Sequence, residues 1–417
     1  MTTTNNNEHK KLNVPNSTDK GNAIRNVPHL RFPEFTGEWE EETLGSVAKV
    51  VGGGTPDTNI QKYWNGNIQW FTPSEIGRDK YVTYSLRTIS EEGLNKSSAK
   101  ILPTGTILLS SRATVGECSI NNVECTTNQG FQSLIAKENI SNEFLFYLIQ
   151  TKRKELIRKS CGSTFLEISA NEVRKIKIAI PTHKEQEKIG KLLALLDERI
   201  ATQNKIIDKL QTLIKGIMAE LQKQGVNRGT WKKETLSNVL TERNERNTNL
   251  YQVFSVSVSQ GVVNQVDYLG RSFAAKNTSK YNVVHYGDLV YTKSPTGSFP
   301  YGIVKQSLNH QNVAVSPLYG VYASNSFAVG AYLNEYFMSD INTHNYLHPL
   351  IQKGAKNTIN ITNQRFLENS VLLPINANEL LLISKLLRSL NHKVKFQQSI
   401  LQKYLEQKQY LLRQMFI

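Results

Sequence analysis

The residues that most invite a chemical interpretation are basic and closely spaced. Five positive charges fall within eight residues of the N-terminal half: Lys152, Arg153, Lys154, Arg158 and Lys159. On a helix these side chains would form a basic band able to meet phosphate oxygens of a nucleic acid. The alternative is a solvated helix face that binds nothing, and the sequence leaves both interpretations open.

Other cations stand alone in segments that look like turns. They are Arg78, Lys80 and Arg112 in the N-terminal half, and Lys293, Lys305, Lys353 and Lys356 in the C-terminal half. An arginine on a loop can donate two hydrogen bonds to a guanine edge, whereas a lysine more often acts as a point charge beside a phosphate. We therefore predict that these residues contribute DNA contacts.

Catalytic and metal-binding patterns are weak by comparison. His344 and His348 have the spacing of two metal ligands on one helix face, but no glutamate lies between them and Pro349 ends any helix there. Gly52–Gly54 lacks the further glycine of a dinucleotide-binding loop. Pro56 and Asp57 lack the acid-x-lysine triplet that completes a metal-dependent nuclease. We expect no catalytic residue, no metal site and no cofactor bound by this chain.

The overall charge points to an anionic partner. The chain has 417 residues and a formal net charge of +15, with 39% hydrophobic residues, which is enough for two or three domains with real cores. Residues 39–184 carry net +3, residues 224–377 net +5 and residues 378–417 net +5. The positive charge therefore extends over both halves, as expected for a long footprint on a polyanion.

The sequence also predicts a cellular location. No run approaches the roughly 18 apolar residues of a membrane span. The polar first 22 residues lack the apolar core of a signal peptide. Cys118, Cys125 and Cys161 are odd in number and not spaced as metal ligands, which favours reduced thiols. We expect a cytoplasmic protein.

Two long helices must position these side chains. Alternating steps of four and three residues define one row of mostly apolar positions, here called the seam. Its first copy comprises Ile189, Leu193, Leu196, Ile200, Gln203, Ile207, Leu210 and Ile214. A shift of 194 residues gives the second copy, which comprises Ile383, Leu387, Leu390, Val394, Gln397, Leu401, Tyr404 and Leu411, with a charged position at Lys408.

This spacing is the coiled-coil period, so we predict helices over 185–223 and 378–417 that pair along their seams. Each is about 58 Å long at 1.5 Å per residue, which suits a spacer. Gln203 and Gln397 occupy the same seam position, and facing amides would fix the register. The alternative is two amphipathic helices that pack on separate cores.

The repeat extends beyond the helices. Trp39–Leu44 resembles Trp231–Leu236, and Gly105–Ser110 resembles Gly287–Thr292. A period near 193 residues indicates a tandem duplication of a strand-rich α+β unit. We predict strands over 106–110, 132–135, 176–180, 253–258 and 289–292, and helices over 142–158, at the edge of the first unit, and 331–341 in the second. Residues 1–30 are expected to be a disordered polar tail.

Several motifs occur in order along residues 31–417: Gly53–Pro56, Tyr63–Trp70, Ser110–Gly116, Asn128–Phe131, Gly162–Phe165 with Ile168 and Ser169, and Pro181 through Ile189. Taken together, they resemble the specificity subunit of type I restriction–modification enzymes. The second half lacks the Gly-Gly-Thr-Pro motif, and Gly354–Thr358 replaces Gly-Ser-Thr. Contact residues therefore do not transfer to it by motif.

The resemblance implies an architecture. Residues 31–184 and 224–377 would be two target recognition domains, and the long helices would form an antiparallel coiled coil with pseudo-two-fold symmetry. Each domain would read one half of an asymmetric, bipartite site in double-stranded DNA, and the helix pair would set the gap between the halves. Leu192, Leu195 and Ile206 lie off the seam, where they either dock partner subunits or broaden the packed stripe.

The resemblance also implies partners that do the chemistry. Two modification subunits would transfer methyl groups from S-adenosylmethionine to adenine, and restriction subunits would use ATP and Mg²⁺ to translocate and cut DNA. Two other functions remain: a basic coiled-coil protein that binds DNA without sequence preference or acts as a scaffold, and a stand-alone DNA enzyme. The missing catalytic motifs argue against the enzyme.

Overall fold

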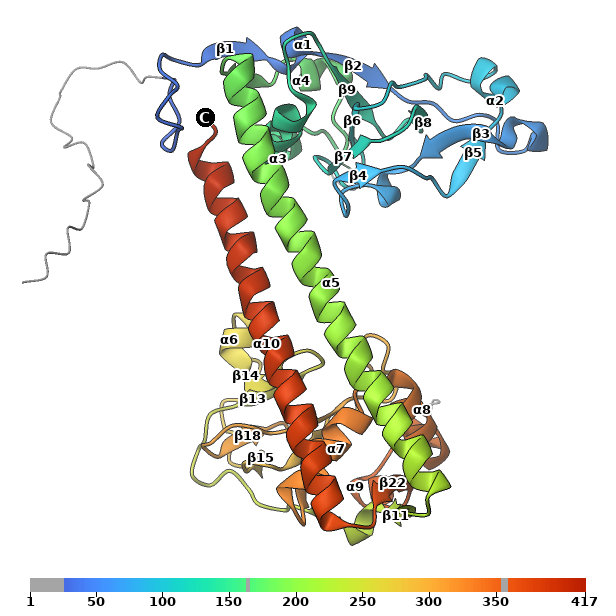
Figure 1. The fold of residues 1–417 in the computed structure, drawn as a ribbon, viewed down its shortest axis with the longest axis vertical. Helices are drawn as coiled ribbons and strands as arrows, with labels where there is room; N and C mark the ends of the chain where they lie inside the picture. Colours follow the sequence, from blue (N-terminus) through green and yellow to red (C-terminus); the bar gives the residue numbers. More distant parts are fainter. Residues whose placement is uncertain (1–25, 163–165, 354–358) are drawn as a thin grey trace, which may run out of the picture. The chain divides into compact units, whose positions relative to one another are not determined.

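The structure, a computed structural model, describes residues 26–162, 166–353 and 359–417. Most of the expected tail and three residues of the motif Gly162–Phe165 lie outside the described residues. The chain forms two compact units, shown in Figure 1. The first comprises residues up to Ala201 together with Lys403–Ile417, and the second comprises Thr202–Gln402.

The first unit is built on mixed sheets. Its largest sheet has the strand order β2(Ala48–Gly52), β9(Gln132–Ala136), β6(Ile107–Leu109), β7(Cys118–Asn121), β4(Tyr81–Val82). A second sheet has the order β5(Arg87–Ile89), β3(Trp64–Phe71), β8(Cys125–Thr127). The pairs β4·β7 and β3·β8 are parallel and the others antiparallel. The predicted strands near 106–110 and 132–135 are confirmed as β6 and β9.

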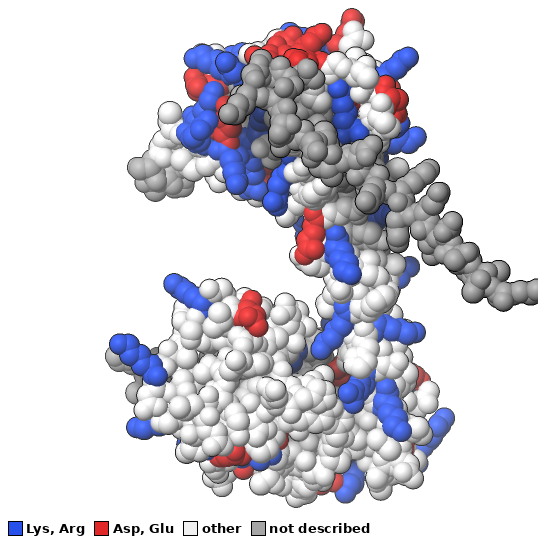
Figure 2. Space-filling view, turned by 90° about the vertical axis from the view of Figure 1, so that its left-hand side faces the viewer, with Lys and Arg blue, Asp and Glu red and all other residues white. Residues whose placement is uncertain are grey.

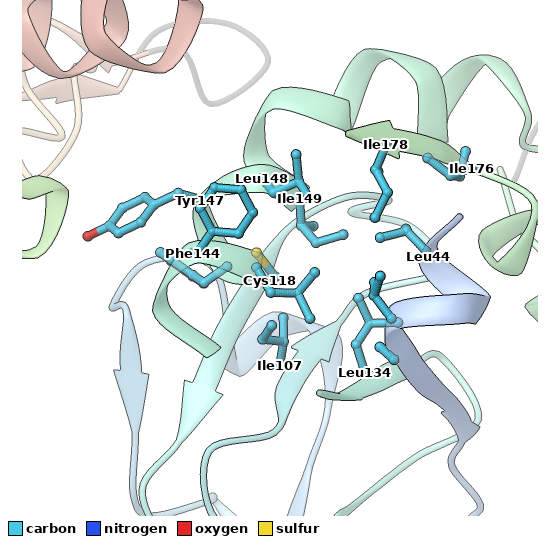
Figure 3. Close-up of a cluster of buried hydrophobic side chains, with 14 of the residues drawn as sticks. Leu44, Ile107, Cys118, Leu134, Phe144, Tyr147, Leu148, Ile149, Ile176 and Ile178 are labelled. Carbon is cyan, nitrogen blue, oxygen red and sulfur yellow. The ribbon is translucent and has the colours of Figure 1, made fainter. Parts of the chain in front are cut away.

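One helix forms the centre of the first unit's core. Helix α3(Asn142–Arg158) has the predicted bounds, and its N-cap Ser141 accepts a hydrogen bond from the Phe144 backbone N–H. All six residues from Phe144 to Ile149 are buried. In Figure 3 its side chains face Ile107, Cys118 and Leu134 of the sheet. The N-terminal half of α3 therefore packs into the core, while its C-terminal half remains largely exposed.

Shorter elements complete the first unit. The two-stranded sheet β1(Glu40–Thr43)·β10(Lys177–Ile180) lies beside the small helices α1(Leu44–Val47) and α4(Ala170–Arg174). The remaining elements are α2(Glu91–Asn95), η1(Gln61–Tyr63) and η2(Pro73–Glu75).

The second unit contains a four-stranded antiparallel sheet and several two-stranded ones. The four-stranded order is β12(Leu240–Glu242), β19(Gly320–Ser324), β16(Leu289–Tyr291), β17(Val304–Gln306). The two-stranded sheets are β11(Trp231–Thr235)·β22(Ser370–Pro374), β13(Phe254–Ser257)·β14(Gly261–Asn264), β15(Asn282–Val284)·β18(Val313–Val315) and β20(Gln352–Lys353)·β21(Ile359–Asn360). Strands β13 and β16 confirm the predictions near 253–258 and 289–292.

The second unit's helices differ from the prediction of one helix over 331–341. The chain forms α7(Phe327–Tyr336) and α8(Asp340–Leu347), separated by a break. Ser339 caps α8 by accepting from the Asn342 backbone N–H. Phe337, at the break, is buried against Tyr346 and Phe366. Tertiary packing of this aromatic ring and a local cap thus outweigh the continuous helical pattern. The other elements are α6(Gln265–Leu269), α9(Asn363–Phe366), η3(Leu236–Asn238) and η4(His348–Leu350).

The two long helices are α5(His183–Asn227) and α10(Ala377–Gln414). Asp197 pairs with Lys408 in the first unit, and Gln203 pairs with Gln397 in the second. The residue numbers of the partners on α10 therefore decrease as those on α5 increase. The helices are therefore antiparallel. Among the described helices, none is both long enough and apolar enough to cross a bilayer.

Seam residues are part of both cores. In the first unit Ile189 and Leu193 are buried with Met415, and Leu411 packs against them; Leu196 is also buried. In the second unit the buried seam residues are Ile207, Ile214, Ile383, Leu387 and Val394, with Leu210, Leu390 and Leu401 partly buried against them. Ile200 and Tyr404 are half-buried.

Two polar contacts interrupt the apolar seam. The Gln203 side-chain amide donates to the side-chain oxygen of Gln397 and, at 3.0 Å, to its backbone carbonyl, which confirms the predicted amide contact. The charged position, Lys408, lies 2.7 Å from Asp197, and each of these side chains is 20% exposed. Because such bonds form only in one alignment, they fix the register of the helix pair.

The same hydrogen bond, from a tryptophan indole N–H to a glutamate, connects a strand pair to a long helix in each unit. This contact is called the joint. Trp39 precedes β1, and its indole N–H donates to Glu185 in the first turn of α5 at 3.4 Å. Trp231 begins β11, and its indole N–H donates to Glu379 in the first turn of α10 at 2.8 Å. Trp231 opposes Pro374 in β11·β22, and Trp39 directly precedes β1, which pairs with β10. The two units therefore share this contact between strand pair and helix as well as the repeated sequence. Arg31 adds a 2.7 Å ion pair to Glu185 in the first unit.

Candidate nucleic-acid interface

The basic cluster on α3 separates into paired and unpaired cations. Arg153 lies 2.6 Å from Glu117, and Lys159 lies 3.6 Å from Glu155. Lys152 is half-buried, donates to the backbone carbonyl of Ile417 at 3.0 Å, and has a pKa lowered by burial.

The two remaining cations of α3 are the ones available to a ligand. Lys154 and Arg158 are exposed, and no described residue pairs with either of them. They are four residues apart, so they lie on the same side of the helix. Among the five cations of the cluster, these two have the most freedom to meet a phosphate.

The turn cations of the first unit have different environments. Arg78 is exposed and has no partner among the described residues. Arg112 is half-exposed and lies 2.7 Å from Glu167. Lys80 is 11% exposed, contacts Glu143 and donates to the Tyr147 hydroxyl at 3.0 Å. Lys80 therefore stabilises the fold in this conformation, whereas Arg78 is free to bind an anion.

The Lys80 contacts belong to a longer polar network that connects the sheet to both long helices. Glu143 also accepts from the Tyr81 hydroxyl, and the Tyr147 hydroxyl donates to Asp197 at 2.6 Å. Burial and then the contact with Asp197 raise the pKa of Tyr147, so its hydroxyl remains a donor. Because Asp197 also pairs with Lys408, β4, α3, α5 and α10 are held by one set of charge-assisted bonds.

Two of the four cations predicted in the second unit, Lys305 and Lys293, are less available. Lys305 was expected in a turn-like segment, but it lies on β17 and is only 4% exposed. Lys293 is half-buried at a positive φ of 59°, and burial lowers its pKa. Lys353 is on β20, and Lys356 lies outside the described residues. Figure 2 agrees with this difference, because Lys and Arg are dense on the visible face of the first unit and sparse on that of the second.

The motifs of the first unit serve packing. A Cβ on Gly53 would lie 2.0 Å from the Asn128 carbonyl oxygen, so only glycine fits against that backbone. The Gly54 carbonyl accepts from the Trp70 indole N–H at 2.9 Å. The Thr55 hydroxyl donates to the Gln129 side chain at 2.5 Å. These residues build the frame that carries the loops.

One exposed feature escaped the sequence analysis. The loop from Thr83 to Leu86, between β4 and β5, presents Tyr84 at 84% exposure and Leu86 at 87%. The stretch Tyr-Val-Thr-Tyr-Ser-Leu alternates apolar and polar residues, as a half-buried strand does. The periodicity gave no means of separating this loop from the strands on either side of it.

Within the described residues, no group of three or more His, Cys, Asp or Glu side chains could hold a metal ion. The rings of His344 and His348 stack on each other at 5.1 Å and lie beside Tyr301.

A family model described as "Type I restriction modification DNA specificity domain" matches residues 36–212. The MjaIX specificity subunit of Methanocaldococcus jannaschii is 37% identical over 180 residues, which is 42% of this chain and 42% of that protein. The EcoR124I/EcoR124II specificity subunit of Escherichia coli is 32% identical over 175 residues, or 40% of this chain and 43% of the relative. The match thus spans about two fifths of these relatives.

The fold comparison extends further along the chain. The crystal structure of a type I restriction–modification S subunit from M. genitalium has a TM-score of 0.62 at 12% identity, and the match covers 94% of this chain and 99% of that one. Its likeness shows the fold alone. Residues 36–212 thus match a type I restriction–modification DNA specificity domain, and the fold of the chain resembles that of a solved S subunit.

Proposed function

We propose that this chain is the DNA sequence-specificity subunit of a type I restriction–modification complex, and that each unit reads one half of an asymmetric bipartite site. The observation that carries the proposal is the repeated joint. Trp39 with Glu185 and Trp231 with Glu379 attach two unlike strand-rich domains to a helix in the same way. A common frame with unlike loops suits two readers with different base preferences.

We further propose that the paired helices α5 and α10 set the gap between the two half-sites and dock the modification subunits. The antiparallel contacts Asp197–Lys408 and Gln203–Gln397 support a fixed register. Leu195 and Ile206 are 50% and 38% exposed, which favours docking over packing for these two residues, whereas Leu192 packs against the first core.

The proposal assigns the reactions to partners and not to this chain. Modification subunits would use S-adenosylmethionine to methylate adenine, and restriction subunits would use ATP and Mg²⁺. The chain itself would act in the cytoplasm as the non-catalytic DNA-binding component. A solved structure from a study of complex assembly of the type I restriction–modification system matches this chain with a TM-score of 0.50 at 14% identity. Its similar fold supports this proposal.

The test is to purify the chain with co-expressed modification subunits and to map methylated adenines on plasmid DNA. We expect methylation at one asymmetric site made of two specific parts and a gap of constant length. The competing function, a basic coiled-coil protein without sequence preference, predicts no recurrent site. A retardation assay on random DNA does not discriminate, because non-specific binding is also salt-dependent.

A further inference from the structure

We propose that Tyr84 and Leu86 are specificity-determining residues that make apolar contacts with the bases of the half-site read by the first unit. The inference rests on the proposed function and names two of the side chains that perform it. Its occupant is duplex DNA. The argument depends on how the loop is held, on what its exposure costs and on the charge around it.

The loop is fixed by its polar groups. Ser85 lies between the two apolar residues, and its backbone N–H donates to the Gln69 side-chain oxygen at 2.7 Å. The Ser85 hydroxyl oxygen accepts from the Trp70 backbone N–H at 2.9 Å. The Leu86 backbone N–H donates to Glu75 at 2.6 Å. The exposure of Tyr84 and Leu86 is therefore imposed by bonds to β3 and η2.

This arrangement forgoes a substantial hydrophobic gain. Burying a leucine side chain ordinarily stabilises a folded protein. Tyr84 and Leu86 are the most exposed of the large hydrophobic side chains in the described part of the chain, and only Ser85 separates them in sequence. Two apolar side chains held in water by a hydrogen-bonded loop favour a binding role for that loop.

The surrounding charge favours an anionic occupant. Residues 78–87 contain Arg78, Lys80 and Arg87 against a single acid, Asp79. Arg78 is unpaired among the described residues, and the exposed Arg87 stacks its guanidinium 3.5 Å from the centre of the Trp64 ring.

Two carboxylates that bond to this loop or to the strand before it are already engaged by the protein. Glu75 binds the Leu86 backbone and accepts from the Thr72 backbone at 2.8 Å. Glu143 binds Lys80 and Tyr81. Their negative charge is thus neutralised or hydrogen-bonded within the fold, and repels an incoming phosphate less.

Duplex DNA has both kinds of group that this loop could bind, namely anionic phosphates and apolar base surfaces. Its phosphates match the arginines, while thymine methyl groups and unstacked base faces accept apolar and aromatic side chains. The loop is also preorganised, because Lys80 and Tyr81 tie the adjacent strand β4 to α3 through Glu143. A rigid loop loses little conformational entropy on binding.

The experiment uses the full chain co-purified with modification subunits, and two labelled duplexes: the site found by methylation mapping and a scrambled version of it. The test variant is Tyr84→Ala with Leu86→Ala. We expect its affinity for the mapped site to fall by about tenfold or more, with little change on scrambled DNA. The slope of log affinity against log salt should stay at the wild-type value, because no phosphate contact is lost.

Two controls sharpen the readout. Ile101→Ala removes another exposed apolar side chain of the same unit and should bind as wild type does. Arg78→Ala should weaken binding to both duplexes, and one lost phosphate contact should reduce the salt slope by about 0.9. Circular dichroism checks that the double alanine variant is folded. We expect a folded variant because the side chains of Tyr84 and Leu86 are mostly exposed.

Three outcomes overturn the inference. The first is a folded double variant that binds the mapped site with wild-type affinity. The second is unchanged DNA binding with a loss of co-purifying modification subunits, since the loop would then contact protein. The third is a wild-type complex without preference for any sequence, which would refute the proposed function itself and with it this inference.

Discussion

At the scale of single residues, burial divides cations that look alike in the sequence. Lys305 is 4% exposed and contacts the Met338 sulfur, and no carboxylate among the described residues bonds to it. Desolvation lowers its pKa from 10.5 to about 8, although Glu335 opposes this effect and Lys395 adds slightly to it. Such a residue costs stability at neutral pH and is poorly placed to contact DNA.

We predict that Lys305→Met stabilises the second unit at pH 7, by up to about 3 kcal/mol if the whole pKa shift is realised. The folded protein loses this proton near pH 8 and the unfolded chain near 10.5. The unfolded state therefore binds more protons between these values, and wild-type stability rises with pH there. The advantage of the variant should shrink across the same window.

The measurement is urea unfolding at pH 7.0, 8.0, 9.0 and 9.5, with variant and wild type compared at each pH so that the ionisation of tyrosines affects both alike. Lys276→Met, at an exposed position of the same unit, is the matched control and should show no such trend. A constant difference between Lys305→Met and wild type across this range would contradict the assignment.

At the scale of elements, the two ends of the helix pair differ at the position of an ion pair. By the shift of 194 residues, Lys408 corresponds to Ile214 and Asp197 to Asn391. The first unit thus has an ion pair at 2.7 Å where the second unit has an apolar residue and an amide. The Asn391 amide donates to Glu335 at 2.5 Å. The second copy therefore suggests isoleucine and asparagine as replacements for Lys408 and Asp197.

We predict that Lys408→Ile alone destabilises the first unit by about 1–3 kcal/mol, because Asp197 keeps a partly buried charge without its cation. Adding Asp197→Asn should restore most of the loss, since an asparagine oxygen can still accept from Tyr147. Urea unfolding of the whole chain followed by circular dichroism measures both variants.

An exposed pair provides the comparison for this cycle. Lys175 lies 3.1 Å from Glu172, and its side chain is 69% exposed. Lys175→Gln should change stability by less than about 0.5 kcal/mol. If Lys408→Ile proves equally mild, the ion pair does not specify the pairing of α5 with α10.

At the scale of the whole molecule, the strand pair at each tryptophan contact marks where a unit can be exchanged. Lys232 opposes Leu373 in β11·β22, so a segment cut at residues 232–374 removes both strands together and leaves Trp231 in place. We predict that replacing this segment with the corresponding domain of another family member changes one half-site of the methylated sequence. Methylation mapping of the exchanged protein is the measurement.

The reciprocal exchange is the control. Residues 41–179 end on opposite strands of β1·β10, where Glu41 opposes Ala179. Their replacement should change the other half-site, with the gap unaltered in both proteins. A change of both half-sites from a single exchange would show that the two units do not read DNA independently.

The helix pair provides a second whole-molecule prediction. Removing residues 204–210 and 390–396 deletes one heptad from each helix and leaves Gln203 facing Gln397. The seam period is preserved, so pairing should survive. We predict a shorter gap and unchanged half-sites in the methylation map. Altered half-site sequences with the original gap would count against a spacer role for the helices.

The sequence by itself determined the repeated strand-rich units, the helix over 142–158 and the seams of the two long helices. These depend on local periodicity, because alternating steps of four and three residues allow one face of a helix to pair with another. The structure confirms helix α3 and the contact of Gln203 with Gln397. The predicted DNA contacts remain predictions.

Only the tertiary structure decided which charged groups meet and which side chains stay in water. Lys408 finds Asp197 from more than 200 positions away, Lys305 is enclosed by packing, and Leu86 is held outside by a carboxylate of another segment. Burial and ion pairing depend on distances between segments remote in sequence, and the desolvation of a charge is a property of everything packed around it. A local pattern of residue types contains none of these distances.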